Sequence, residues 1–562
     1  MEKPIISFNN FSFQYLSQAE PTLKQIELEI QAGEKILIAG PSGSGKSTLA
    51  KCLNGLIPNE DRGELTGKCL INGKDITTTD IFELSFTTST ILQDTNSQFV
   101  GLTVAEDIAF ALENDALPKN EMQVQVAKWA KELNLTELLT HSPQKLSGGQ
   151  KQRVSLAGVL VDGSPILLFD EPLANLDPVA SLQTMELIDK LQSKTKATVI
   201  IIEHRLEDVL ACQPDRIIVM ANGQIVADQT PTELFKTALL PQVGLRRPLF
   251  LEALIKAGID VTNFPDLTNV SALPDDLQIK KALAKSYLSP KTSEKSPSVP
   301  LLKVKDLSFS YEVNSPLLQQ ISFTLNKGDF VSLVGQNGAG KTTLIKLICG
   351  FLNGTGSIAL DQTDLSKTSI KERAEQIGYI MQDPNQMISQ KMIFDEVALG
   401  LRLRGADEQS VREKVMQVLK VCGLYAYRNW PITALSYGQK KRVTIASILV
   451  LEPQILILDE PTAGQDYRTY TEIMQFLRYL NRKKNCTIVI VTHDMHLMLE
   501  YTTRSLVISH GRLLADLHPS ELLARPKLLE KASLRQTSLY QLAKKYDLSA
   551  KAMLSSLYHE ET

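Results

Sequence analysis

The sequence predicts an α/β protein made of two similar units, each with a mostly parallel sheet core, a helical subdomain and an N-terminal β region. Three observations support this fold class. The same motifs occur twice in the same order. In each copy, a strand-like segment is followed by a glycine-rich loop and then by a predicted helix, at 47–56 or 342–351. Apolar segments such as 165–169 and 454–458 are typical of strands buried on both faces.

The internal repeat has a strict register. From the shared glutamine (Gln93 or Gln382) to the shared histidine (His204 or His493), each copy spans 111 residues, an offset of 289. Such a register indicates one folded unit present as two copies. The predicted divisions are a first unit over 4–245, a helical or irregular segment with a flexible linker over 246–300, a second unit over 301–535 and a helical C-terminal tail over 536–562.

Composition excludes several classes of protein. The 562 residues carry 60 basic and 63 acidic side chains, which argues against a bulk nucleic-acid binder. The six cysteines form no CxxC pair, which argues against structural zinc and iron–sulfur sites; we expect Cys349 and Cys486 to be small core residues. Apolar runs are much shorter than the roughly 20 residues that cross a bilayer. We therefore expect any membrane role to require a partner chain.

Two glycine-rich loops carry the clearest chemical signal. Glycines let backbone N–H groups turn around phosphate oxygens, and the positive end of the next helix faces the same anion. In such loops the lysine reaches the β- and γ-phosphates and the following hydroxyl binds Mg²⁺. The predicted nucleotide-binding residues of the loops are Gly40, Pro41, Ser42, Gly43, Ser44, Gly45, Lys46, Ser47 and Thr48, and Gly335, Gln336, Asn337, Gly338, Ala339, Gly340, Lys341, Thr342 and Thr343.

Acidic pairs follow apolar strands in both copies. Asp170 and Asp459 come at predicted strand ends, where a carboxylate can hold Mg²⁺. Side chains alternate along a strand, so the next residue, Glu171 or Glu460, is expected to point in another direction. A carboxylate beside the γ-phosphate can polarise the attacking water. These glutamates are the predicted catalytic bases.

A histidine and a glutamine complete each predicted site. An isolated histidine is more often structural, but His204 and His493 follow apolar strands on the phosphate side, which favours a catalytic contact with the γ-phosphate. Gln93 and Gln382 lie between the loop and the helical subdomain. We predict that they bind nucleotide and complete the Mg²⁺ and water shell.

Two similar sequence segments, 11–15 and 307–311, each end in a tyrosine. An aromatic face can stack on adenine, so Tyr15 and Tyr311 are predicted to bind the base. The alternative is a strand aromatic in the core, a role that we assign to Phe13 and Phe309.

The segment Leu-Ser-Gly-Gly-Gln at 146–150 points to a family. Together with a phosphate loop and an apolar run ending in Asp-Glu and then His, it resembles ATP-binding cassette (ABC) ATPases, a class of P-loop NTPase. The resemblance covers nearly all of both units. It implies that ATP lies between the loop of one unit and the LSGGQ segment of the other, so that ATP binding closes the pair. It assigns this segment to Ser147, Gly148, Gly149 and Gln150, and to Ser436, Tyr437, Gly438 and Gln439, and the D-loop to Asp177 and Asp466.

One position departs from the family pattern. Tyr437 stands where the family usually has glycine, and tyrosine adopts a positive φ only at a cost. The resemblance pairs Lys46 with Ser436. We therefore hypothesise that this site is active but slower than the other.

Finer similarity points to importers of the energy-coupling-factor type. The similar segments are 93–99, 103–107, 110–114, 202–206 and 382–386. In that group two cassettes drive a transmembrane scaffold protein, which works with a separate membrane substrate-binding protein. The resemblance implies uptake of a vitamin, a vitamin precursor or a transition metal ion, and a peripheral location on the cytoplasmic face of the cell membrane. The expected partner surface is 94–115 and 383–403.

Other functions stay open at this stage. A soluble tandem ABC ATPase that acts on ribosomes also has two cassettes, but typically has a long charged helical linker, whereas 241–300 is mixed and interrupted by prolines. The fused ATPase of another importer or an exporter is a further alternative. In fused sugar-importer ATPases the second loop is usually degraded, whereas 335–342 is intact.

Overall fold

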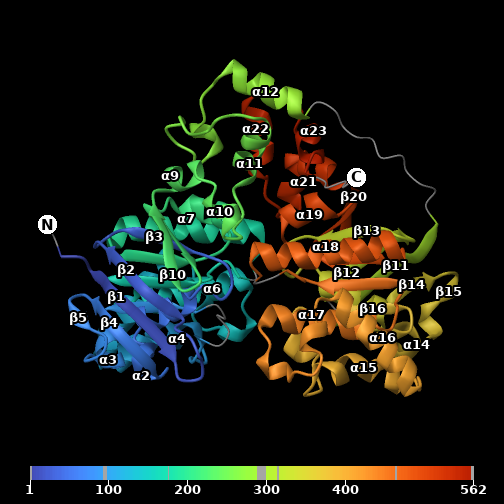
Figure 1. Cartoon of the computed structure of the whole chain (residues 1–562), viewed down its shortest axis with the longest axis horizontal. Coiled ribbons are helices and arrows are strands. Elements are labelled where there is room, and N and C mark those ends of the chain that lie inside the picture. The colour runs from blue at the N-terminus through green and yellow to red at the C-terminus, as the bar shows by residue number, and fades with distance from the viewer. Residues whose placement is uncertain are drawn as a thin grey trace. The chain divides into compact units, whose positions relative to one another are not determined.

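The computed structural model describes residues 3–92, 98–174, 176–287, 299–312, 315–462 and 465–557. Its contacts divide the chain into two compact units, one of 1–275 with 466–468 and the other of 276–465 with 469–562. Both units contain two sheets and flanking helices (Figure 1). In the described part of the chain, no helix has both the length and the apolar character needed to cross a membrane.

The first unit contains a four-stranded antiparallel sheet and a six-stranded, mostly parallel sheet. The antiparallel sheet has the order β2-β1-β4-β5, with β1 Ile6–Tyr15, β2 Leu23–Ile30, β4 Gly63–Ile71 and β5 Lys74–Asp75. The larger sheet has the order β10-β9-β3-β8-β7-β6, with β3 Lys35–Ala39, β6 Thr88–Ile91, β7 Ile166–Asp170, β8 Thr198–Ile202, β9 Arg216–Ala221 and β10 Gln224–Gln229. Only β10 runs antiparallel to its neighbour in that sheet.

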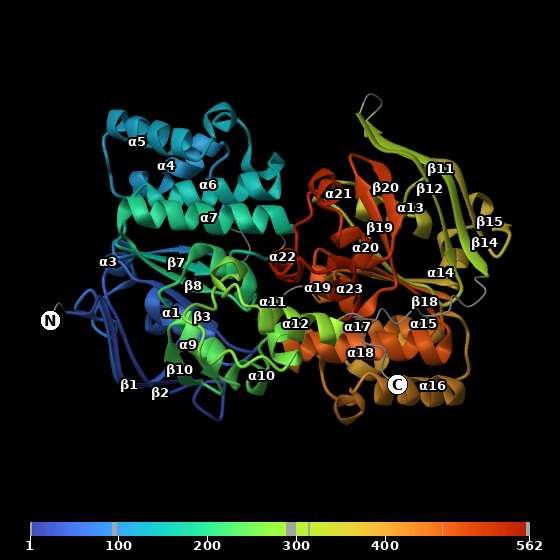
Figure 2. The same cartoon turned by 90° about the horizontal axis from the view of Figure 1, so that it is seen from above.

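Helices of the first unit lie around this sheet and in a separate subdomain. In Figure 2, α4, α5 and α6 gather beside α7, and α4 packs on both α5 and α6. The helix α4 begins at a capping box of Thr103 and Glu106, which satisfies its first N–H groups. The helices are α1 Lys46–Leu53, α2 Leu56–Asn59, α3 Ile81–Ser85, α4 Val104–Asn114, α5 Lys119–Glu132, α6 Gly148–Leu160, α7 Pro178–Thr195, α8 Leu206–Val209, α9 Pro231–Lys236, α10 Leu239–Gln242 and α11 Leu249–Lys256.

The second unit repeats the strand order of the first. Its antiparallel sheet is β12-β11-β14-β15, with β11 Pro300–Glu312, β12 Ser315–Asn326, β14 Thr355–Leu360 and β15 Thr363–Asp364. Its larger sheet is β16-β17-β18-β13-β19-β20, with β13 Phe330–Val334, β16 Ile377–Ile380, β17 Ile455–Asp459, β18 Thr487–Val491, β19 Arg504–Ser509 and β20 Arg512–Leu517. The predicted pair of mostly parallel α/β cores is confirmed.

The helices of the second unit follow the same plan and continue past it. The helix α15 packs on α16 and α17, as α4 does on α5 and α6. Further helices precede and follow the repeated part of this unit in sequence. Among them, α23 contacts both α20 and α22. The helices are α12 Leu277–Tyr287, α13 Lys341–Cys349, α14 Ile370–Ala374, α15 Ile393–Leu403, α16 Glu408–Val421, α17 Tyr437–Leu449, α18 Tyr467–Lys484, α19 Met495–Tyr501, α20 Pro519–Leu523, α21 Pro526–Lys531, α22 Ser538–Lys545 and α23 Ala550–Ser555.

The hydrophobic cores explain why the repeated apolar runs form central strands. In each unit, residues of the parallel strands and of the helix after the glycine loop belong to one buried cluster with residues of the antiparallel sheet. All six cysteines are buried and unpaired, which confirms the core role expected for Cys349 and Cys486. The glycine loop is therefore held between two well-packed elements.

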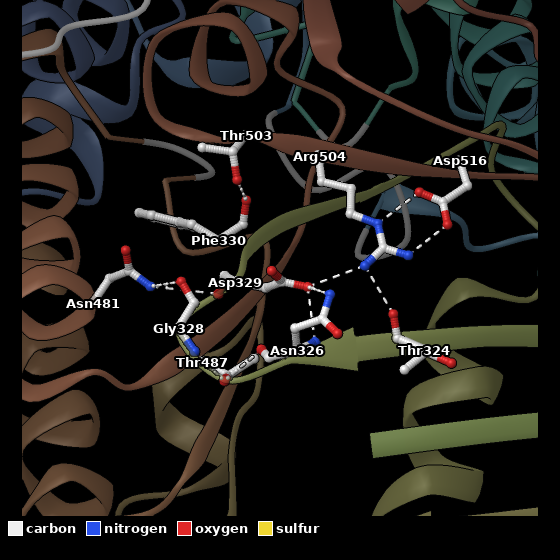
Figure 3. A network of polar contacts seen from close by, with 10 residues as sticks. All are labelled: Thr324, Asn326, Gly328, Asp329, Phe330, Asn481, Thr487, Thr503, Arg504 and Asp516. Carbon is white, nitrogen blue, oxygen red and sulfur yellow. Dashed lines mark hydrogen bonds and ion pairs between the residues drawn. The ribbon is translucent and has the colours of Figure 1, made fainter. Parts of the chain in front are cut away.

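A polar network fixes the start of β13, the strand that leads into the second loop (Figure 3). The Arg504 guanidinium donates to both carboxylate oxygens of Asp516 at 2.7 and 2.6 Å, and to Asp329 at 3.0 Å. The Gly328 carbonyl accepts from Asn481 at 2.9 Å, and the Gly328 N–H donates to the Thr487 hydroxyl at 3.0 Å. Bidentate arginine–carboxylate pairs of this kind fix geometry as well as adding energy.

The first unit contains the same network before β3. Arg216 donates to Asp228 at 2.9 and 3.0 Å and to Glu34 at 3.2 Å. Gly33 has the same two kinds of partner: its carbonyl accepts from Gln192 at 2.7 Å and its N–H donates to Thr198 at 3.0 Å. The duplication thus extends to side-chain contacts outside the recognised motifs.

Candidate active sites

The glycine loops lie between a central strand and the helix that follows it. Gly45 and Gly340, the N-cap residues of α1 and α13, have φ of 101° and 97°, a region that favours glycine. At the start of each loop, a Cβ on Gly40 or Gly335 would collide with a backbone carbonyl of the neighbouring strand region. Both loops therefore need glycine for close backbone approach as well as for their turns.

The loop lysines point back over their own loops. Lys46 Nζ donates to the carbonyl oxygens of the first two loop residues at 2.7 and 2.9 Å, and Lys341 Nζ makes the same contacts at 2.8 and 2.9 Å. Both side chains are buried. Burial lowers the pKa of Lys46, although nearby carboxylates such as Glu171 oppose this effect. The amino groups lie at the place where the motif requires a cation for phosphate oxygens.

A pocket of about 430 Å³ lies beside the first glycine loop. It is lined by Gln18, Glu20, Pro21, Thr22, Lys24, Gly43, Gly45, Lys46, Ser47, Thr48, Asn222 and Gly223. Tyr15 Oη lies 3.3 Å from the hydroxyl of one lining residue, Thr48. The equivalent pair in the second unit, Tyr311 and Thr343, is separated by 3.4 Å.

These contacts bring both tyrosines to the phosphate-loop helices. Phe13 is fully buried, as predicted, whereas Phe309 is only half-buried. Tyr311 is 62% exposed. Adenine stacking stays a prediction.

The strand-end aspartates occupy the predicted positions as the last residues of β7 and β17. In the second unit, Thr342 Oγ1 donates to Asp459 Oδ2 at 3.1 Å. Burial raises the pKa of both Asp170 and Asp459. A hydroxyl and a carboxylate side by side are oxygen ligands of the kind that Mg²⁺ prefers, so the residues present fit this ion.

The predicted reason for the direction of the glutamates was wrong. Glu171 and Glu460 lie beyond the strands, in the left-handed region with φ of 48° and 47°. Their N–H groups donate to Ile202 O at 2.9 Å and Val491 O at 3.0 Å, on the neighbouring parallel strands. A strained turn, rather than the alternation of side chains along a strand, therefore directs these carboxylates.

The predicted catalytic glutamate and histidine are arranged differently in the two units. His493 Nε2 lies 2.9 Å from Glu460 Oε1. In the first unit, His204 Nδ1 is 4.0 Å from Glu171 and only 3.2 Å from Glu203, a buried carboxylate that also accepts the His204 N–H. Sequence reasoning gave Glu203 no role. An acidic residue directly after a fully apolar strand was the available signal.

The same difference appears in the proton affinities of the two bases. Burial, with the charges of Glu203 and Asp170 in addition, raises the pKa of Glu171 to about 7. Burial also acts on Glu460, but His493 and Lys341 oppose it and hold the pKa of this carboxyl below its ordinary value. Within each unit, charged side chains from three separate segments are thus close enough to act on one another.

The LSGGQ-type segments begin helices α6 and α17. Ser147 caps α6 and exchanges hydrogen bonds with Gln150 at 3.4 and 2.9 Å, and Ser436 and Gln439 repeat this capping box at 3.3 and 3.0 Å. Capping leaves part of the N–H set at the helix start available for an anion.

The strain argument about Tyr437 was wrong. Tyr437 is the first residue of α17 and has no positive φ, and neither has Gly148 at the matching position. A Cβ on Gly148 would meet no described atom within 4 Å. The Tyr437 hydroxyl instead donates to the Gln382 carbonyl at 3.3 Å, which links the segment to the glutamine of its own unit.

Of the three remaining predicted residues, Gln93, Asp177 and Asp466, the structure describes only the two aspartates. Gln93 lies outside the described residues. Asp177 caps α7 by accepting from the Ala180 N–H at 2.9 Å, and Asp466 is buried directly before α18.

Comparison with known proteins identifies the class. Residues 23–174 and 318–463 match the family model described as ABC transporter, so the chain belongs to this family and contains two of its ATP-binding domains. Residues 237–309 match a second model, described as ATP-binding cassette cobalt transporter. The resemblance to ATPases of the energy-coupling-factor type is thereby supported along the chain between the two domains.

The similar proteins have the same description, and the similarity covers nearly the whole length of each of them. Putative ABC transporter ATP-binding proteins of Lactobacillus johnsonii and Enterococcus faecalis are 61% and 57% identical, over 98% and 97% of this chain and 96% of each relative. One of Lactiplantibacillus plantarum is 54% identical over 100% of this chain and 99% of its own. A solved structure, cbiO1 from Clostridium perfringens, part of the ABC transporter complex cbiONQ, is 32% identical, with a TM-score of 0.40 over 44% of this chain and 99% of its own.

Proposed function

We propose that this chain hydrolyses ATP at two sites and thereby energises a membrane transporter whose membrane-spanning parts are partner chains. The observation that carries the proposal is the cluster present in each unit: a buried loop lysine, a strand-end aspartate, a glutamate in a left-handed turn and a histidine. Membership of the ABC transporter family implies that ATP hydrolysis is linked to transport.

Each kind of residue in the cluster has its own role in the reaction. Glu171 and Glu460 accept a proton from the water that attacks the γ-phosphate, while the loop lysines stabilise charge on the phosphate oxygens. His204 and His493 contact the γ-phosphate and orient the glutamates. Mg²⁺, when bound, neutralises charge on the β- and γ-phosphate oxygens. It would be held by Ser47, Asp170 and Gln93, and by Thr342, Asp459 and Gln382.

In the ATP-bound state we infer that the signature segments complete the sites. By the family resemblance, Lys46 shares its nucleotide with Ser436, and Lys341 shares its nucleotide with Ser147. Support comes from the capped helix starts at both serines, since N–H groups at the start of a 13-residue helix can donate to a γ-phosphate. Loss of this phosphate on hydrolysis then releases the pair.

We further propose an importer of the energy-coupling-factor type on the cytoplasmic face of the cell membrane. Its partners would be a transmembrane scaffold and a separate membrane substrate-binding protein. The cobalt-transporter match at 237–309 supports this type and favours a transition metal ion over a vitamin or vitamin precursor as cargo. Of the partner surface proposed at 94–115 and 383–403, residues 94–97 lie outside the described residues. Exposed apolar side chains support the rest of this surface: Val100, Leu102, Phe110 and Leu403 are 62%, 82%, 42% and 75% exposed.

Purification in mild detergent tests the proposal. We expect the full chain to copurify with two kinds of membrane protein and to hydrolyse ATP, and the substrate-binding partner would identify the cargo. The matched control is a variant with Leu102→Asp and Leu403→Asp, which should keep nucleotide binding and lose the membrane partners. Recovery of the chain in the ribosome pellet, with no membrane partner, would favour the soluble tandem ATPase instead.

A further inference from the structure

The second unit has a tyrosine beside its strand-end carboxylate that the first unit lacks. Tyr379 lies on β16, next to β17, and its Oη donates to Asp459 Oδ2 at 3.3 Å. Thr342 Oγ1 donates to the same oxygen at 3.1 Å. Two hydroxyl groups on one carboxylate oxygen restrict rotation of the carboxylate about its Cβ–Cγ bond.

The tyrosine ring is itself held in place. It packs against the Phe351 ring with ring centroids 6.2 Å apart, and the Tyr379 side chain is half-buried. A tyrosine hydroxyl is protonated at neutral pH, so it acts as a donor to the carboxylate.

The first unit has no equivalent donor at this position. The offset of 289 places Thr90 at the position of Tyr379, and the two strands have the same register against β7 and β17. The buried Thr90 hydroxyl finds no hydrogen-bond partner among the described residues. A threonine lacks the phenol ring that carries the Tyr379 hydroxyl to Asp459.

We propose that Tyr379 is a positioning residue for the divalent cation that accompanies ATP at the site of Lys341, and that it acts through Asp459. This inference rests on the proposed function. Groups that hydrogen-bond to a metal-binding carboxylate fix its orientation, and their loss typically costs about 10–100-fold in metal affinity. The site of Lys341 therefore binds its metal more tightly than the site of Lys46, which has Asp170 without such a tyrosine.

The test compares Tyr379→Phe with its matched control, Thr90→Val, in the full chain carrying Lys46→Ala so that the second site is measured. Mn²⁺ serves as the probe ion and is followed by its EPR signal as ATP binds. We expect Tyr379→Phe to need about 10-fold more Mn²⁺ for half-maximal ATP binding. Its ATP affinity in EDTA and its melting temperature should equal those of the parent, and Thr90→Val should change none of the three.

Two results would overturn the inference while leaving the proposed function intact. One is an unchanged Mn²⁺ midpoint in Tyr379→Phe. The other is an equal loss of ATP affinity with and without the ion, which would indicate a merely structural role. A parent that binds no ATP, or whose binding survives Lys341→Ala, would overturn the proposed function and this inference with it.

Discussion

The two units share a fold and nearly every motif, yet the glutamates that we propose as catalytic bases have different surroundings. Glu460 is paired with His493 at 2.9 Å, whereas Glu171 stands 4.0 Å from His204, which is held by Glu203. Thr492 occupies the position of Glu203 in the second unit. One substitution next to the histidine therefore distinguishes two sites that motif matching treats as equal. The comparison shows that a residue next to the shared motif residues can change the surroundings of a duplicated site.

The largest expected effect removes a loop lysine. Lys46→Ala and Lys341→Ala should each lower turnover at their own site by about 10²–10³-fold, the usual cost of deleting one group that stabilises transition-state charge. Single-turnover hydrolysis and nucleotide binding by the purified full chain measure this. Should either variant keep full binding and full turnover, the assignment of that loop as a phosphate site is wrong.

Next in size is the loss of the catalytic base. We expect Glu460→Gln to lower overall turnover more than Glu171→Gln, by about 10-fold relative to each other, because the Glu460–His493 pair is already assembled. Steady-state ATPase rates of the two variants and of the double variant measure the difference. Equal residual rates would reject the asymmetry of the two sites.

The pH dependence of stability is expected to differ because of one pair of matching residues in the two signature helices, α6 and α17. Lys441 is fully buried and donates to the Glu460 carbonyl at 2.6 Å, where the first unit has Gln152 donating to Pro172. Burial lowers the pKa of Lys441 to about 8. Because this is below the ordinary lysine value of 10.5, the unfolded chain holds the proton more tightly, and stability rises with pH between about 8 and 10.5.

The variant Lys441→Gln isolates this contribution. Relative to the variant, the natural chain should gain roughly 1–3 kcal/mol in unfolding free energy between pH 7.5 and 10. Thermal or urea unfolding at the two pH values measures the gain, and Gln152→Lys is the matched substitution in the first unit. A constant difference between the chains across this range would contradict the lowered pKa.

A smaller effect concerns the arginine networks. Arg504→Lys and Arg216→Lys each lose a bidentate contact with an aspartate, and we expect a loss of about 1 kcal/mol in stability for both, because the pairs are only partly buried. Calorimetry on each variant measures it. Since the arginine–aspartate pairs of the two networks correspond, a large difference between the variants would show that the units are less alike than these pairs indicate.

The smallest effect is expected at Tyr437. Because its backbone is not strained, Tyr437→Gly should change turnover at the site of Lys46 by less than about 2-fold through relief of strain. Tyr437→Phe separates the hydroxyl contact with Gln382 from the bulk of the ring. A several-fold increase in the glycine variant would revive the idea that this residue slows the site.

Much of this architecture could be predicted from the sequence because the decisive signals are local. The strands Ile166–Asp170 and Ile455–Asp459 agree with the apolar segments predicted at 165–169 and 454–458, and the strand-end positions of Asp170 and Asp459 follow from them. The left-handed turns at Glu171 and Glu460 were missed, since they depend on hydrogen bonds to a strand distant in sequence. Tyr379 was missed for a similar reason, because it acts through Asp459, which only the folded sheet brings near. Glu203 was missed although it adjoins His204 in sequence, because its contact depends on how the two side chains are directed.

The arginine network at the start of β13 has a consequence for the loop that follows the strand. That end of the strand is tied to β12, β19 and β20 by charged contacts (Figure 3). Along its length, β13 is also paired with β18 on one side and with β19 on the other. Both sets of contacts oppose sliding of the strand along its axis, so Gly335, directly after its last residue, begins the second glycine loop from a fixed place.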